Sequence, residues 1–355
     1  MTGGRGRAIV NANDKTREEH HMRTITRRRV SALAGAGILL PRFAKAAEIN
    51  WKFTSSQPPA HPSTQRYIEA AERVKQASNG RLEITVFHSG QLGTDIDTYT
   101  QVRIGGVQMM VLSNVITATA APLTSALSMP FAFKNYDEVW AAADGKLQDL
   151  LRADLKKAGY LSTNKILDSG FHQITSNRGP VSTVADVQGL KLRAPPSPIQ
   201  VSLWKSIGAA PASMNFSELF TALQTGVVDG QESPPSLART TRLYEVQKYM
   251  SLTSHLWDGW YTLINPRAFN KLPPDLQELV MAEFDRAGVE NRKDMAVFNK
   301  DAVTFIAGKG VQINEVADTS SFRLKLKDVG FYAEWRDKLG PDVWNALQEI
   351  SGPLV

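Results

Sequence analysis

Few residues in this 355-residue chain have the types and spacings that covalent chemistry requires. The sequence contains no G-x-S-x-G nucleophile elbow, P-loop, H-E-x-x-H helix or calcium loop. It has no cysteine, which excludes a thiolate nucleophile, a thiolate metal site and an iron–sulfur centre. The histidines beyond the first 46 residues are far apart, without helical spacing: His61, His88, His172 and His255. We therefore expect a binding protein with no catalytic residue, cofactor or metal site.

Two carboxylates near position 230 are the strongest remaining candidates for acid–base chemistry. Asp229 follows Gly226 closely, and we expect its side chain to accept backbone hydrogen bonds that fix the turn after that glycine. Glu232 is expected near a binding site, where it could accept a hydrogen bond from a ligand hydroxyl. Neither role requires a reaction.

The distribution of charge argues against a nucleic-acid partner. The whole chain has a formal net charge of +6, but residues 1–46 contain ten basic and three acidic residues. The rest of the chain contains 31 basic and 32 acidic residues. The basic excess therefore belongs to the N-terminal segment, and the remainder lacks the basic surface that nucleic acid requires.

The N-terminal segment has the pattern of a secretory signal peptide. Arg27–Arg29 precede an apolar stretch at 30–40, and Ala44-Lys45-Ala46 form a small-x-small end, so cleavage is expected after Ala46. The sequence around Arg27–Arg29 also fits a twin-arginine signal, so both export routes stay open. A short packed helix is the alternative, which Gly35 and Pro41 disfavour. Met22 is a second candidate start, and no apolar run is long enough to span a membrane.

Segments typical of strands and helices alternate after the leader. Residues 49–55 and 82–87 are predicted strands, residues 62–78 a helix that ends at Asn79-Gly80, and residues 107–112 another apolar run. This alternation favours an α/β fold. Residues 100–107 and 221–228 also match in register as helix end, glycine and valine-led strand. Either the two domains use the same unit or the match is a coincidence.

Residues 272–308 form the longest predicted helical segment. Pro273 and Pro274 begin it, Gly308 ends it, and it would extend for about 50 Å as one helix. That length suggests a helix that crosses two domains, in which Gly288 could allow a bend. Two shorter helices with a break at 290–293 are the alternative.

The most informative motifs lie between residues 170 and 235. The first is Asp186-Val-Gln-Gly189-Leu-Lys-Leu-Arg193-Ala-Pro. The second is Phe216-Ser-Glu218-Leu-Phe-Thr-Ala-Leu-Gln-Thr-Gly226-Val-Val-Asp229-Gly230-Gln-Glu232. Earlier segments add Phe87-His-Ser-Gly-Gln91-Leu-Gly93 and Leu127-Ser-Met-Pro130-Phe. Together they resemble the DctP-type solute-binding proteins of TRAP (tripartite ATP-independent periplasmic) transporters, over essentially all of residues 47–350.

The resemblance implies a two-domain, type II-like periplasmic-binding-protein clamp of α/β class, with a long helix that spans both domains. Residues 1–46 would be the leader. Domain I would comprise residues 47–170 plus 259–298, and domain II residues 171–258 plus 299–355. The chain would cross between the domains more than once, and the domains would close on a ligand.

Arg193 is the residue that the resemblance implicates most strongly in binding. In the family, the arginine of this motif holds the carboxylate of the ligand. The planar guanidinium suits that role because it donates two parallel, charge-assisted hydrogen bonds to a carboxylate. Without the surrounding motif, a surface arginine at a strand end would be the simpler interpretation.

Three further positions depart from patterns found in relatives. His172 stands where many relatives have a second arginine. It could offer the ligand at most one hydrogen bond, or a positive charge at lower pH. Ser113 and Ser233 stand about where sialic-acid receptors have a glutamate and an asparagine. These differences argue against sialic acid. Some relatives bind a metal ion with the ligand, but the residues of that pattern are not evident here.

Aromatic residues complete the expected site. Phe216 matches a family aromatic that packs on the ligand. Trp257 and Trp260 would add an apolar wall or else pack in the core. The ligand-binding set is then Arg193, His172, Phe216, Ser233, Glu232, Ser113 and Trp257.

The resemblance implies a monomeric periplasmic receptor that captures an organic-acid anion and delivers it to the small and large membrane subunits of a TRAP transporter. A periplasmic enzyme with Glu232 or His172 as its base, and a ligand-sensing module, are the alternatives. The sequence does not select one carboxylate as the ligand.

Overall fold

The computed structural model describes residues 48–354. The predicted leader, with its cleavage site and its alternative start, lies outside these residues. Within them, no helix combines the length and the hydropathy that crossing a membrane requires.

The first of two mixed sheets contains the N-terminal strands. Its strand order is β2-β1-β3-β11-β4, and β5 also pairs with β11. Strand β1 is parallel to β2 and β3, whereas β11 is antiparallel to β3, β4 and β5. The strands are β1 (Ile49–Thr54), β2 (Leu82–Phe87), β3 (Met109–Ser113), β4 (Leu161–Ser162), β5 (Leu167–Phe171) and β11 (Trp257–Ile264). The strands predicted at 49–55 and 82–87 are thus present.

The second sheet has the strand order β12-β10-β6-β9-β7-β8. Here β7 is parallel to β8 and β9, and β6 is antiparallel to β9 and β10. The strands are β6 (Gln173–Ser176), β7 (Lys191–Ala194), β8 (Ala210–Ser213), β9 (Gly230–Ser233), β10 (Tyr249–Leu252) and β12 (Gln312–Glu315). Two sheets interleaved with helices confirm the α/β class.

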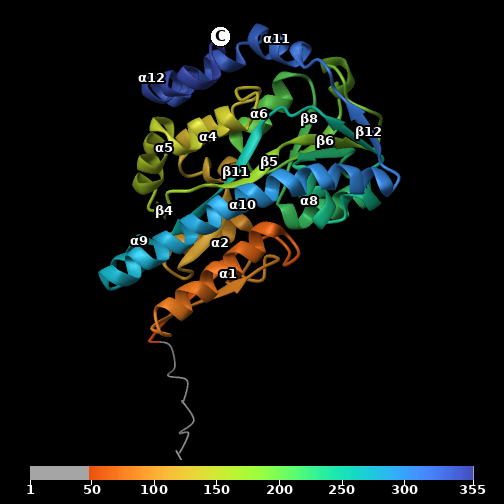
Figure 1. Ribbon diagram of the computed structural model, residues 1–355. Helices are drawn as coiled ribbons and strands as arrows, with labels where there is room; N and C mark the ends of the chain where they lie inside the picture. Colours follow the sequence, from red (N-terminus) through yellow and green to blue (C-terminus); the bar gives the residue numbers. More distant parts are fainter. Residues whose placement is uncertain (1–47, 355) are drawn as a thin grey trace, which may run out of the picture. The chain divides into compact units, whose positions relative to one another are not determined.

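Helices cover the strands and complete the fold. The shorter helices are α1 (Pro62–Ala77), α2 (Asp95–Ile104), α3 (Asn114–Thr117), α4 (Tyr136–Asp144), α5 (Lys146–Lys157), α6 (Pro198–Ser206), α7 (Leu219–Gln224), α8 (Pro235–Thr240), α9 (Pro266–Asn270) and α11 (Ser320–Asp328). The last, α12 (Phe331–Ser351), is kinked at Gly340 and contacts α4, α5 and α6. The longest, α10 (Pro274–Gly308), lies beside α1 (Figure 1).

The two sheets contain topologically equivalent units. In the first, β1-α1-β2-α2-β3 places β3 beside β1 and against the antiparallel β11. In the second, β7-α6-β8-α7-β9 places β9 beside β7 and against the antiparallel β6. Gly105 after α2 and Gly226 after α7 both have left-handed backbones, with φ of 91° and 73°. Glycine adopts this conformation without steric cost, which accounts for the matching sequences at 100–107 and 221–228.

Helix α10 is continuous through residues 290–293, so the alternative of two shorter helices is wrong. It contacts α1 and β5 on the side of the first sheet, and α8 and β12 on the side of the second. Gly288 does not mark a break. A Cβ atom there would lie 2.8 Å from the carbonyl oxygen of Lys165, so the glycine allows the helix to approach a loop closely.

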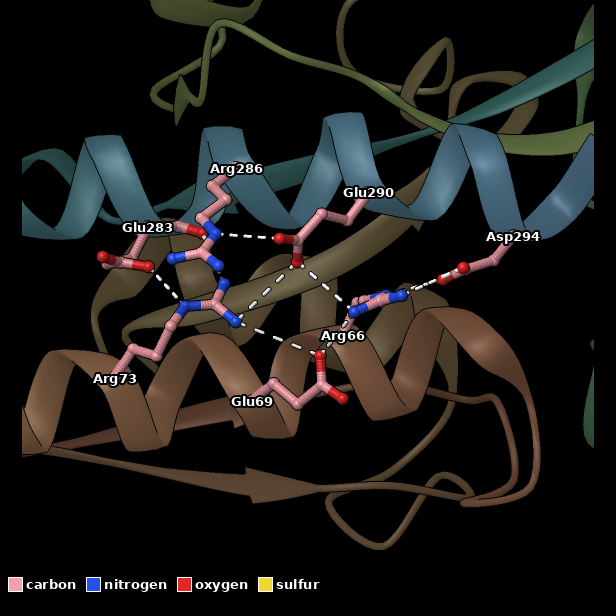
Figure 2. Close-up of polar contacts among 7 residues, drawn as sticks. All are labelled: Arg66, Glu69, Arg73, Glu283, Arg286, Glu290 and Asp294. Carbon is pink, nitrogen blue, oxygen red and sulfur yellow. Dashed lines mark hydrogen bonds and ion pairs between the residues drawn. The ribbon is translucent and has the colours of Figure 1, made fainter.

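Ion pairs join α1 to α10 along their length (Figure 2). The guanidinium of Arg66 donates to both carboxylate oxygens of Asp294, at 2.6 and 3.0 Å, and Arg73 donates to Glu283. Glu290 accepts from Arg286 on its own helix and lies 3.4 Å from Arg66. Half-buried pairs of this kind each contribute about 0.2–1 kcal/mol, so their main effect is to fix how the two helices are aligned.

Within residues 48–354, the chain passes between the sheets at three places. His172 alone separates β5 from β6, residues 253–256 connect β10 to β11, and α10 with its following turn leads to β12. Two connections between sheets therefore lie next to each other, because β5 pairs with β11 and β6 pairs with β10.

Candidate functional site

A cavity of about 510 Å³ lies between loops from both sheets. The first-sheet side contributes the loop after β1, the loop between β2 and α2, and the first residue of α2. The second-sheet side contributes the start of α7 and the chain after α8. Hydroxyl groups are frequent in its lining, from Ser56, Ser89, Thr94, Ser217, Thr240 and Thr241. Apolar surface comes from Pro58, Phe216, Leu219, Phe220 and Leu243, so the wall suits an organic ligand that also carries hydroxyls.

Asp95 provides a carboxyl group at the edge of this cavity. It is the first residue of α2, which Thr94 caps: the Thr94 hydroxyl accepts from the Asp97 amide, and the Asp97 carboxylate accepts from the Thr94 amide. Burial raises the pKa of Asp95 to about 6, although a hydrogen bond from Ser56 and the charge of Arg193 act in the opposite direction. The carboxyl is therefore mostly ionised at neutral pH.

Arg193 lies on β7 and is only 4% exposed. Its Nε and Nη2 atoms both donate to the carbonyl oxygen of Met214, at 3.2 and 2.9 Å. No described residue accepts a hydrogen bond from Nη1. Burial lowers the pKa of Arg193 to about 10, against the opposing charges of Glu232, Asp95 and Glu218, so the side chain stays charged at neutral pH.

Phe216 connects Arg193 with the cavity. Its ring lines the cavity wall, and the guanidinium carbon of Arg193 lies 5.9 Å from the ring centroid. Residues 216–218 form a short 3-10 turn before α7, so this ring is held at the start of a helix. The structure thus brings together the predicted arginine and the predicted aromatic residue.

Ser113 and Trp260 line a smaller cavity of about 30 Å³ next to the main one. Ser56 and Asp95 border both spaces. The Ser113 hydroxyl donates to Asp258 at 2.7 Å. Ser113 therefore lies beside the candidate site, although its hydroxyl is already paired.

His172 and Glu232 form a buried pair. His172 Nδ1 contacts Glu232 Oε2, while its Nε2 lies 3.7 Å from Asp258 Oδ2, and His255 Nε2 lies 3.3 Å from the same Glu232 oxygen. Burial alone would raise the pKa of Glu232, but the charge and hydrogen bond of His172 lower it to about 2. Burial would lower the pKa of His172, but Glu232 and Asp258 raise it to about 9. Neither residue lines the main cavity.

Two other predicted residues are placed away from the cavity. Trp257 packs edge-on against Trp140 in the core, and its Nε1 donates to Asp168 at 2.8 Å. Ser233 is 3% exposed at the end of β9. Asp229 accepts from the backbone amide of Lys191 at the start of β7. It thus fixes the neighbouring strand, where we had expected it to fix the turn after Gly226.

Sequence reasoning missed Asp95 and the hydroxyl-bearing loops. The capping pattern Thr94-x-x-Asp97 was visible and marks the start of α2. This capping pattern does not reveal that the chain after α8, far away in sequence, lies across the cavity from the start of α2.

Comparison with known proteins identifies the family. The family model described as bacterial extracellular solute-binding protein, family 7 (DctP), matches residues 53–334. The 2,3-diketo-L-gulonate-binding periplasmic protein YiaO of Escherichia coli is 30% identical over 249 residues, which are 70% of this chain and 76% of that protein. The C4-dicarboxylate-binding periplasmic protein DctP of Rhodobacter capsulatus is 32% identical over 269 residues, 73% of this chain and 79% of that protein.

Solved structures show the same architecture. A TRAP periplasmic solute-binding protein from a Sulfitobacter species, with bound β-D-galacturonate, superposes with a TM-score of 0.80 at 28% identity. The match covers 86% of this chain and all of that one. The predicted two-domain periplasmic-binding fold is confirmed, and the family consists of transport receptors, which are not enzymes. Since the family model extends over most of its length, the chain belongs to the DctP-type solute-binding proteins of TRAP transporters, the family that its motifs predicted.

Proposed function

We propose that the protein is a periplasmic receptor that captures an organic-acid anion in the 510 Å³ cavity and delivers it to the membrane subunits of a TRAP transporter. The observation that carries this proposal is the charged, buried Arg193, whose guanidinium carbon lies 5.9 Å from the ring centroid of Phe216 in the cavity wall. Among the described residues, none accepts a hydrogen bond from its Nη1. A carboxylate that pairs with this guanidinium would gain charge-assisted hydrogen bonds in a setting that screens them little.

The same cavity favours a hydroxylated monocarboxylate over a dicarboxylate. Asp95 is ionised at neutral pH and would repel a second carboxylate, while it can accept hydrogen bonds from hydroxyls. The serine and threonine hydroxyls of the lining can do the same. Sugar acids fit this chemistry, in keeping with the galacturonate bound to the Sulfitobacter protein.

A thermal-shift series tests the proposed ligand class directly. D-galacturonate, D-gluconate and succinate would be compared with D-galactose, which lacks the carboxylate. A bound ligand at about 100 times its dissociation constant adds roughly 2.7 kcal/mol to stability. We expect a sugar acid to stabilise the protein, succinate to do so less, and galactose not at all. A shift with galactose equal to that with galacturonate would contradict a carboxylate receptor.

The remaining expectations about the whole chain belong to the same proposal. The domains would be residues 47–170 plus 259–298 and residues 171–258 plus 299–355, with ligand bound between them by a monomer. Ligand contact would involve Arg193 and Phe216 first. Ser113, Ser233, Glu232, His172 and Trp257 would act mainly by supporting them, because their polar atoms or rings already contact other residues or the core.

Export of the chain also follows from its proposed periplasmic role. The mature protein should begin at or near Ala47, because the small-x-small end precedes it. N-terminal sequencing of protein from the periplasm checks this. Retention of Arg27–Arg29 in that protein would show that no signal peptide is removed there.

A further inference from the structure

Three buried side chains in the described part of the chain bring potential metal ligands together. His172, Glu232 and His255 each offer one ligand atom, and these atoms all lie within 4.8 Å of one another. The side chains are 4%, 1% and 2% exposed. They are 60 and 23 positions apart in sequence, so no ligand spacing was visible along the chain.

The orientation of both imidazole rings fits metal coordination. His172 Nδ1 and His255 Nε2 both point to Glu232 Oε2. The opposite nitrogens have oxygen neighbours: His172 Nε2 lies 3.7 Å from Asp258 Oδ2, and His255 Nδ1 lies 2.8 Å from the Thr253 hydroxyl. Metal-bound histidines usually donate their outer N–H to such an oxygen, which fixes the ring and its tautomer.

Protein partners do not fully satisfy this cluster. Glu232 Oε1 is buried without a hydrogen-bond partner, and so is His172 Nε2 at its present distance from Asp258. A buried carboxylate oxygen without a partner is costly. A cation between the three residues would offset the charge of this buried carboxylate, and the cluster is walled by Trp204, whose ring lies 5.0 Å from that of His255.

We propose that His172, Glu232 and His255 form a binding site for a zinc-like divalent transition-metal ion. Two imidazoles and a carboxylate are a donor set that zinc accepts, with bonds of about 2.0–2.2 Å. An ion bonded to all three residues would replace the present direct contact between His172 Nδ1 and Glu232 Oε2.

The position of the site gives the ion a mechanical role. His172 is the whole connection between β5 and β6, His255 lies in the connection between β10 and β11, and Glu232 belongs to β9. An ion held by all three residues would join two of the connections between the sheets, those at His172 and at residues 253–256, to strand β9. It would stabilise the fold and stiffen the region through which domain closure must pass.

The test is titration calorimetry of the full, untagged chain with zinc chloride after treatment with a chelator. Three other histidines, His20, His21 and His88, are first replaced by alanine, so that they cannot contribute adventitious binding. We expect one zinc ion per chain. Cobalt(II) should bind the same protein with the same stoichiometry, and zinc should displace it.

Matched variants separate coordination from structural damage. His172→Arg keeps a cation beside Glu232 and Asp258 but cannot ligate, and should lower zinc affinity at least about 100-fold while the protein stays folded. Asp258→Asn changes only an outer partner and should cost about 10–100-fold. His255→Gln provides a second ligand deletion if His172→Arg does not fold.

The outcomes are decisive in both directions. Absence of stoichiometric zinc binding in the triple-alanine protein would overturn the proposal and leave a protonated His172 bridging two carboxylates. Zinc affinity unchanged by His172→Arg or His255→Gln would assign the ion to another place. Organic-acid binding is measured in separate titrations, so either result leaves the proposed receptor function untouched.

Discussion

Arg193 illustrates how the fold prepares a single residue for a ligand. Burial opposes its charge, yet Glu232, Asp95 and Glu218 lie near enough to sustain it. Two of its nitrogens are held by the Met214 carbonyl, which fixes the plane of the guanidinium. An incoming carboxylate therefore meets a donor whose orientation is already set, so little side-chain entropy is lost on binding.

A second residue, Asp168, predicts a pH dependence of stability. It is fully buried on β5, where it accepts from Trp257, and burial raises its pKa from 3.8 to about 7. Between these two values the folded state holds a proton that the unfolded state has released. Asp168 therefore contributes stability that is lost as pH rises from about 4 to about 7, by an amount on the order of a few kcal/mol, whereas the lowered pKa of buried His61 acts in the opposite direction.

Asp168→Asn checks this prediction, because the amide oxygen can still accept from Trp257 but carries no charge. The thermal midpoint of the variant minus that of the wild type should be more positive at pH 8 than at pH 5, because only the wild type loses the Asp168 contribution over this range. Asp337→Asn, at a side chain that is 71% exposed, controls for the loss of one carboxylate. Equal pH dependence in wild type and Asp168→Asn would contradict the assignment.

At the scale of elements, the long helix α10 contacts the structure around both sheets, and its close packing at Gly288 can be tested. Gly288 should resist substitution, because a Cβ atom there meets the Lys165 carbonyl oxygen at 2.8 Å. Gly288→Ala should destabilise the protein by roughly 1–3 kcal/mol, as overpacking does. This loss would exceed the gain of up to about 1 kcal/mol that alanine brings to a helix.

Gly308→Ala is the matched control, since no atom lies within 4 Å of its added Cβ. It should be neutral or slightly stabilising in urea denaturation. If Gly288→Ala proved as stable as Gly308→Ala, close packing of α10 on the loop at Lys165 would be refuted.

The elements also show what could be predicted from the sequence. The spacing of apolar residues and the residues at helix ends predicted β1, α1 and β2. Pro62 and Asn79-Gly80 mark the two ends of the first helix. The continuity of α10 could not be decided in this way, because its middle is held by Arg66 and Arg73 of another helix. The partners of His172 were equally hidden, since Glu232 and His255 are brought to it by strand pairing across the second sheet and its connections. The motif around Arg193 predicted its role. The place of Asp95 at the cavity could not be predicted, because it results from the contact of loops that are far apart in sequence.

For the whole molecule, the proposed mechanism is ligand-driven closure of two domains. Loops and helix ends attached to both sheets line the main cavity, so a ligand that contacts both sides favours the closed arrangement by its extra contacts there. Small-angle scattering should show a smaller radius of gyration when a confirmed ligand is added. The Arg193→Ala protein, if it binds no ligand, should show no change on the same addition. Identical wild-type profiles with and without ligand would speak against closure.

The central claim is that the buried guanidinium of Arg193 receives the carboxylate of the ligand. Titration calorimetry with the organic acid that stabilises the wild type tests it in wild type, Arg193→Lys and His172→Ala. Lysine keeps the charge but loses the fork, and loss of a buried hydrogen-bonded pair costs about 2–5 kcal/mol. Affinity should then fall at least roughly 30-fold in Arg193→Lys, and less in His172→Ala, whose side chain is not part of the cavity lining. Near wild-type affinity in a folded Arg193→Lys protein would contradict the account, because the carboxylate would then be held elsewhere.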